Sequence, residues 1–136
     1  MSGTGLGASL LLLAAGSIAC EIATNLPDTN PLLGSWSWVE ATGGIAGHTI
    51  TPASTGQTIV LRFREEQVDL VRNDELERTV EYERVAQPGG SDLELTYDGP
   101  LLGGFESQTA SLPEENVLIL TDPCCDGFEY RLERIR

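Results

Sequence analysis

Alternation of apolar and polar residues with a period of two is the feature that most limits what this chain can fold into. The alternation begins at Trp36 and recurs to the end of the chain in short spans separated by Gly, Pro, Asn and Asp. A period of two places successive side chains on opposite faces of a β-strand, whereas a helix needs a period of about 3.6. Leu93, Leu95 and Tyr97 alternate with polar residues most clearly, which predicts one dry face and one solvated face.

Eight spans of this kind succeed one another, and most connections between them are short. We therefore predict an all-β fold: an antiparallel up-and-down meander of about eight strands, closed into a small barrel. Closure removes the exposed edges that an open sheet would have to protect. The predicted strands are residues 35–39, 58–63, 68–71, 79–83, 92–98, 105–110, 117–121 and 128–133.

One segment, residues 64–85, is also compatible with a charged helix, because it is rich in Glu, Arg, Leu and Val. Several of its residues are β-branched, and such side chains are restricted in a helix. Asn73 and Asp74 are typical of a tight turn between two strands. These two features favour a hairpin.

The N-terminal part predicts export. Residues 1–19 carry no charged side chain, and their apolar run is shorter than the roughly 20 residues of a membrane-spanning helix. The run ends in small residues before Cys20, which resembles the lipobox of bacterial lipoproteins. Residues 1–19 are thus predicted to be a lipoprotein-type signal peptide, with a lipid on Cys20. The alternative is an N-terminal strand or helix in which Cys20 is simply buried.

The charged side chains are confined to residues 21–136. Residues 20–31 contain two prolines and several Asn and Asp, which predicts a flexible tether, and residues 32–136 form the predicted barrel domain. Eight arginines, no lysine and 21 acidic residues give a net charge of −13. Nucleic-acid binding needs clustered cations, so we expect no nucleic-acid partner. The predicted location is the bacterial cell envelope, on a membrane reached through the lipid of Cys20.

A family resemblance rests on the two ends of the predicted barrel. The segment Leu33-Gly34-Ser35-Trp36-Ser37-Trp38-Val39, the glycine-rich stretch after it and the ending Leu132-Glu133-Arg134-Ile135 resemble the small bacterial lipocalin-like lipoproteins. The resemblance implies that Gly34, Trp36 and Arg134 form a barrel-closing signature. Trp36 would plug the closed end, and Arg134, in phase with the apolar side of its strand, would stack on the indole.

The function implied by the barrel depends on its interior. We expect binding of a small apolar or amphipathic ligand, and the candidate lining residues are Trp38, Phe63, Tyr82 and Tyr97. The alternative is a solid-cored envelope module that binds a protein partner and has no small-molecule ligand. An open interior would favour the first function, and a filled core the second.

The remaining chemistry-bearing residues are few. Residues 43–56 form a long glycine-rich connection, either a lid or a rigid link, and include His48, the single histidine. Cys124 and Cys125 are adjacent, so a disulfide between them would be strained; free thiols and intermolecular pairing are the alternatives. No residue pattern indicates catalysis, a metal site or a cofactor, so we expect no enzyme activity.

Overall fold

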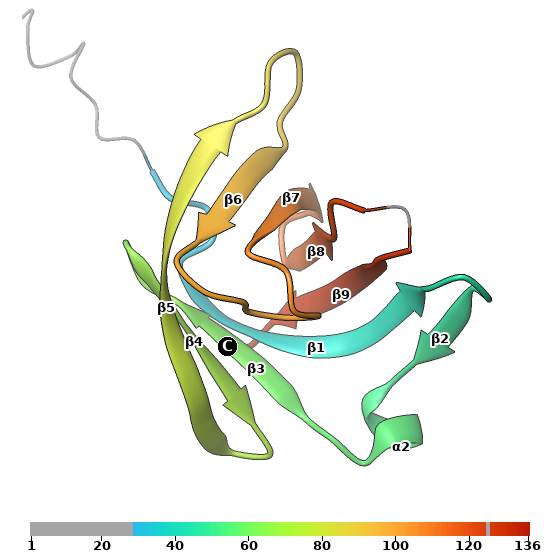
Figure 1. Cartoon of the computed structure of the whole chain (residues 1–136). Coiled ribbons are helices and arrows are strands. Elements are labelled where there is room, and N and C mark those ends of the chain that lie inside the picture. The colour runs from blue at the N-terminus through green and yellow to red at the C-terminus, as the bar shows by residue number, and fades with distance from the viewer. Residues whose placement is uncertain (1–28, 125) are drawn as a thin grey trace, which may run out of the picture. The chain divides into compact units, whose positions relative to one another are not determined.

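The computed structural model describes residues 29–124 and 126–136, and the chain divides into two units, residues 1–30 and 31–136 (Figure 1). Every described strand belongs to the second unit. Its elements in chain order are β1 (Gly34–Gly43), β2 (His48–Ile50), α2 (Pro52–Thr55), β3 (Ile59–Phe63), β4 (Gln67–Arg72), β5 (Glu75–Ala86), β6 (Leu93–Tyr97), β7 (Ser107–Glu114), β8 (Val117–Thr121) and β9 (Phe128–Arg134).

The strands form one antiparallel sheet in the order β2-β1-β3-β4-β5-β6-β7-β8-β9, and β1 also pairs with β9. This last pairing closes eight strands, β1 and β3–β9, into a barrel with sequential neighbours, which confirms the predicted meander. β2 is a ninth, short strand that pairs with the end of β1. It lies in the stretch that the sequence predicted to be irregular.

Residues 64–85 form strands, not a helix. β4 and β5 pair as a hairpin, and Asn73 and Asp74 between them have φ values of 51° and 68°. Two successive residues with positive φ make the turn that matches the right-handed twist of paired strands. The side-chain oxygen Oδ1 of Asn73 also accepts a hydrogen bond of 2.9 Å from the backbone N–H of Thr58. The turn is therefore tied to the start of β3.

The long connection between β1 and β3 is ordered into two short elements. β2 runs back along the end of β1, and α2 comes next as a single helical turn. Thr51 and Ser54 form a capping box at its start, and Gly56 ends it in the left-handed conformation. The structure thus places a short hairpin and a capped turn where the sequence left a lid and a rigid link as alternatives.

The inward-facing side chains form one hydrophobic core, as the period of two requires. Leucines from most of the strands are fully buried in it, and the loop between β6 and β7 adds Leu101 and Leu102. Of the exposed large apolar side chains, Leu76 and Val85 lie nine residues apart on β5, and Leu33, Ile45 and Ile135 lie outside the strands. Apolar side chains therefore face the core and polar side chains face the solvent along the strands.

Candidate functional site

β4 and β6 pair with different halves of β5, and a hollow lies where the two pairings meet. β5 pairs with β4 as far as Glu81 and with β6 from Tyr82 onward. Asp98, directly after β6, accepts a hydrogen bond of 2.9 Å from the backbone N–H of Glu81 through Oδ1. The β3–β4 turn, the middle of β5 and the end of β6 therefore border a common groove.

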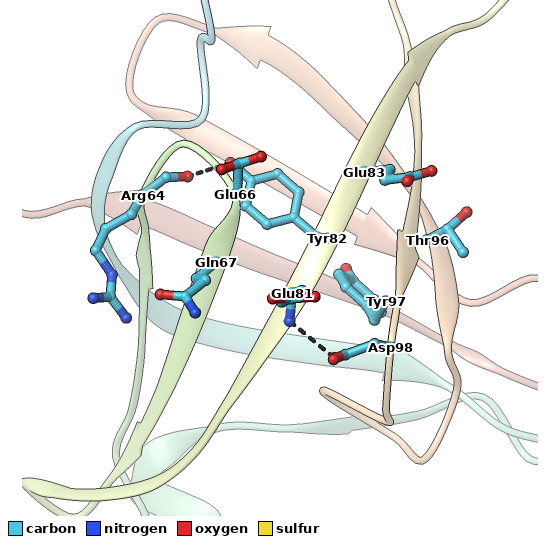
Figure 2. A pocket seen from close by; sticks show the side chains of 9 residues that line it. All are labelled: Arg64, Glu66, Gln67, Glu81, Tyr82, Glu83, Thr96, Tyr97 and Asp98. Carbon is cyan, nitrogen blue, oxygen red and sulfur yellow. Dashed lines mark hydrogen bonds between the residues drawn. The ribbon is translucent and has the colours of Figure 1, made fainter.

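This groove has a volume of about 670 Å³ (Figure 2). Its residues are Arg64, Glu66, Gln67, Glu81, Tyr82, Glu83, Thr96, Tyr97 and Asp98. Glu81 and Glu83 alternate with the buried Tyr82, so their carboxylates stand on the outer face of the barrel. We call this site the acidic groove. Its size falls within the range of small-molecule sites, about 300–1,000 Å³.

The charges of the acidic groove do not cancel. Four carboxylates line it, against one guanidinium, that of Arg64. Arg64 is already engaged, because its Nη2 lies 2.6 Å from Oδ1 of Asp69, a buried carboxylate outside the groove. The groove therefore presents a net negative surface that would attract a cationic group.

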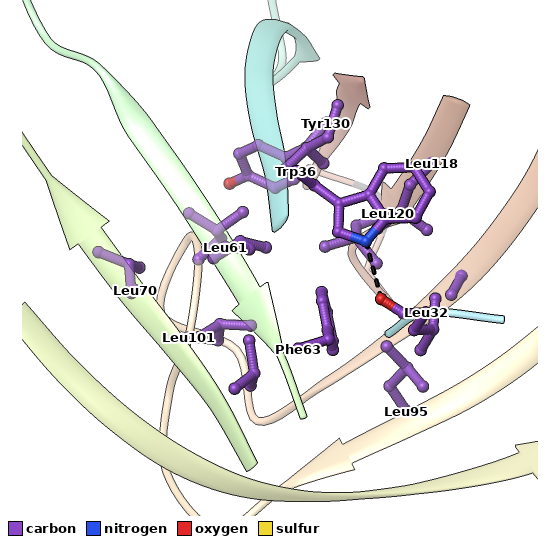
Figure 3. Packing of buried hydrophobic residues seen from close by; sticks show 14 of the residues in the cluster. Leu32, Trp36, Leu61, Phe63, Leu70, Leu95, Leu101, Leu118, Leu120 and Tyr130 are labelled. Atoms are coloured by element: carbon purple, nitrogen blue, oxygen red, sulfur yellow. Dashed lines mark hydrogen bonds between the residues drawn. The ribbon is translucent and has the colours of Figure 1, made fainter. Parts of the chain in front are cut away.

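The residues of the predicted barrel-closing signature lie together at one end of the barrel. Trp36 and Arg134 are cross-strand partners, and the guanidinium carbon of Arg134 lies 4.2 Å from the centre of the Trp36 ring, so the predicted stacking contact is present. Arg134 also donates hydrogen bonds of 2.6 and 3.2 Å to the carbonyl oxygens of Leu33 and Pro31. The Trp36 indole donates to the Leu32 carbonyl at 2.8 Å (Figure 3).

Gly34 fits this arrangement for a steric reason. Its φ is +120°, and a side-chain Cβ there would stand 2.8 Å from Nη1 of Arg134. A larger residue would thus both strain the backbone and displace the guanidinium. Gly34, Trp36 and Arg134 therefore form one structural unit that covers this end of the core.

The four candidate ligand-lining residues are all buried in the core. Trp38, Phe63, Tyr82 and Tyr97 retain 2–5% of their surface. Phe63 and Tyr82 pack edge to face with ring centres 5.3 Å apart, and the Tyr82 hydroxyl donates to the carbonyl of Arg64 at 2.5 Å. Tyr82 and Tyr97 also border the acidic groove. These aromatic side chains thus belong to the buried core, and their ligand-lining role stays a prediction.

A buried polar chain crosses the opposite end of the barrel. The Tyr97 hydroxyl donates to Oε1 of Gln108, Nε2 of Gln108 donates to Oδ1 of Asp122, and the backbone N–H of Phe128 donates to Oδ2 of Asp122, each at 2.8 Å. Burial, with the nearby Asp122 carboxylate, raises the pKa of Tyr97 far above its usual value and that of Tyr130 to about 12.

Sequence reasoning missed this chain. Gln108 is fully buried, and it stands in the inward phase of its strand, two residues before the buried Ala110. A polar residue in an inward position was the one available signal. The role of Asp122 was hidden, because an Asp before Pro123 in a turn is typical of a solvated residue.

The other sequence candidates stand apart from these sites. His48 is exposed at the start of β2, and Cys124 is exposed after β8. Cys20 and Cys125 lie outside the described residues, so the lipid site and the vicinal disulfide stay predictions. Within residues 29–124 and 126–136, no three His, Cys, Asp or Glu side chains gather as a metal site would require.

No helix in the described part of the chain is both long enough and apolar enough to cross a bilayer. No protein-family model matches the chain, and comparisons with curated proteins and with solved structures gave no significant match. The resemblance to lipocalin-like lipoproteins therefore stays a prediction from the sequence.

Proposed function

We propose that this protein is a lipid-anchored module of the bacterial envelope that binds a cationic partner in the acidic groove. The observation that carries the proposal is the groove itself: about 670 Å³ of space on the barrel exterior, lined by four carboxylates and one engaged arginine. The role is binding and not catalysis.

The state of the interior supports this function over binding of an apolar ligand inside the barrel. The four aromatic residues expected to line such a ligand all belong to the hydrophobic core cluster, and two of them, Phe63 and Tyr82, pack edge to face. Of the two functions that the sequence left open, a packed interior favours the solid-cored interaction module. The acidic groove supplies the binding place for such a partner, and its negative charge calls for a partner with positive charge.

The groove is tested by binding of a fluorescently labelled arginine-rich peptide to the purified full chain. An exposed ion pair contributes about 0.2–1 kcal/mol, so Glu81→Gln with Glu83→Gln should weaken binding roughly two- to thirtyfold. The matched control is Glu114→Gln with Glu129→Gln, which removes the same charge from exposed positions on β7 and β9. Equal weakening in both double variants would mean that only the net charge attracts the peptide.

The anchor is tested separately, because it depends on Cys20 and not on the barrel. Cells expressing the full chain are labelled with a palmitate analogue, and wild type is compared with Cys20→Ala. We expect label on the wild type only, with the variant released from the membrane fraction. One acyl chain binds a protein to a membrane only marginally, whereas several hold it there stably. A wild-type protein that takes up no label would refute the anchor.

A further inference from the structure

The two tryptophans of β1 differ in how their indole N–H groups are satisfied. Trp36 donates to the Leu32 carbonyl at 2.8 Å. Trp38 retains 5% of its surface, and its Nε1 has no hydrogen-bond partner among the described residues. A buried donor without a partner costs about 1–3 kcal/mol, and native proteins pair more than roughly 90% of such groups.

The strand pairing of the barrel is interrupted at the backbone of Trp38. On one side of β1, pairing with β3 ends at Ser37 and pairing with β2 begins at Ala41, so Trp38, Val39 and Glu40 have no strand partner there. On the other side, the register with β9 shifts between Trp38 and Glu40. Both ladders flanking Trp38 are therefore irregular within the same three residues.

The strand neighbours of Trp38 supply no acceptor. Its cross-strand partner on β9 is Leu132, and continuing the β1–β3 register would bring it opposite Ile59. Both are buried apolar residues. Residues 29–124 and 126–136 thus offer the indole no acceptor, and the strand pairing is interrupted at the same residue.

We propose that Trp38 Nε1 forms a binding site for one hydrogen-bond acceptor oxygen at the junction of β1, β2 and β3. The oxygen belongs either to a single ordered water molecule or to a small amphipathic molecule with one carbonyl or hydroxyl group. This site is independent of the acidic groove, because Trp38 is not among the residues that line it.

The proposal is tested by NMR on the ¹⁵N-labelled full chain, in which two indole N–H signals are expected. Trp38→Phe assigns them. If that variant fails to fold, contacts of the Trp36 indole proton with Leu32 assign that signal, and the other belongs to Trp38. Trp36 is the internal reference for a hydrogen-bonded indole. We expect the Trp38 proton to show a comparable downfield shift.

The source of the oxygen is then read from two further measurements. A cross-peak from water to the Trp38 indole proton, absent for Trp36, identifies ordered water. An added mass in native mass spectrometry of protein purified from its own host, lost with Trp38→Phe but kept with Glu81→Gln and Glu83→Gln, identifies a small molecule. An indole proton shifted as in a free N–H would overturn the proposal. So would a hydrogen-bonded proton with neither water contact nor added mass, because the acceptor would then be the protein.

Discussion

At the scale of single residues, Arg134 explains how one side chain can cover an end of the core. Its guanidinium stacks on Trp36 and bonds two carbonyl oxygens of the segment that leads into β1. Stacking contributes about 0.5–2 kcal/mol and each hydrogen bond about 0.5–1.5 kcal/mol. The family resemblance implied the stacking, and the phase of its strand placed Arg134 on the apolar side. The carbonyl bonds were not predictable, because they depend on how the backbone before β1 turns.

We predict that Arg134→Ala lowers the free energy of unfolding by about 2–4 kcal/mol. Arg134→Lys should lower the free energy of unfolding by about half as much, because a single ammonium cannot stack on the ring and reach both carbonyls together. Urea unfolding at neutral pH measures both. The control is Arg131→Ala on the same strand, whose exposed pair with Glu133 at 3.6 Å should contribute less than about 1 kcal/mol. Equal losses at the two positions would contradict the structural role of Arg134.

Tyr130 gives a second prediction at this scale. Burial and Asp122 raise its pKa to about 12, above the ordinary value of 10.0. Below pH 10 the phenol is neutral in both states, and its contribution to stability is fully present. Between pH 10 and 12 the unfolded chain loses a proton that the folded chain keeps, so stability falls as pH rises. Urea unfolding across this range should show a steeper fall for wild type than for Tyr130→Phe, and parallel profiles would refute the assignment.

At the scale of elements, the β4–β5 hairpin rests on a turn in which neither residue is glycine. A non-glycine residue in the left-handed region costs roughly 1–2 kcal/mol, and Asn-Gly is the preferred pair for such a turn. The Asn73 side chain accepts a hydrogen bond from the Thr58 backbone N–H, so replacing Asn73 would remove this contact. We predict that Asp74→Gly raises the free energy of unfolding by up to about 1 kcal/mol. Asp74→Val should lower it, and thermal unfolding of both variants decides; stabilisation by valine would contradict the turn geometry.

Strands were predictable because their signal is local. Leu93, Leu95 and Tyr97 face the core in the structure with the phase that the sequence indicates. β7 was the weakest prediction, expected at residues 105–110 and found at Ser107–Glu114. It continues past the predicted end through Pro113, which the register irregularity after Ser111 accommodates. β2 was missed because its three residues, His48–Ile50, are too few to show an alternation of apolar and polar side chains.

At the scale of the whole molecule, the acidic groove could not be predicted from the sequence. Glu81 and Glu83 were expected on the solvated face, and they are exposed. What brings Glu66 and Asp98 beside them is the exchange of partners along β5, a long-range property of the register. The net charge was readable from the composition, but its concentration at one place on the exterior was not.

The net charge of −13 also has a consequence for the molecule as a whole. Like charges on a compact surface repel one another, and unfolding separates them. Added salt shortens the reach of this repulsion, to about 10 Å at 0.1 M, so we predict that the urea midpoint rises between very low ionic strength and 0.1 M NaCl. The groove variant with Glu81→Gln and Glu83→Gln should respond less than wild type, because it lacks two of the repelling charges. A midpoint independent of salt would show that charge repulsion does not destabilise the fold, and an equal rise in the variant would show that Glu81 and Glu83 do not contribute to it.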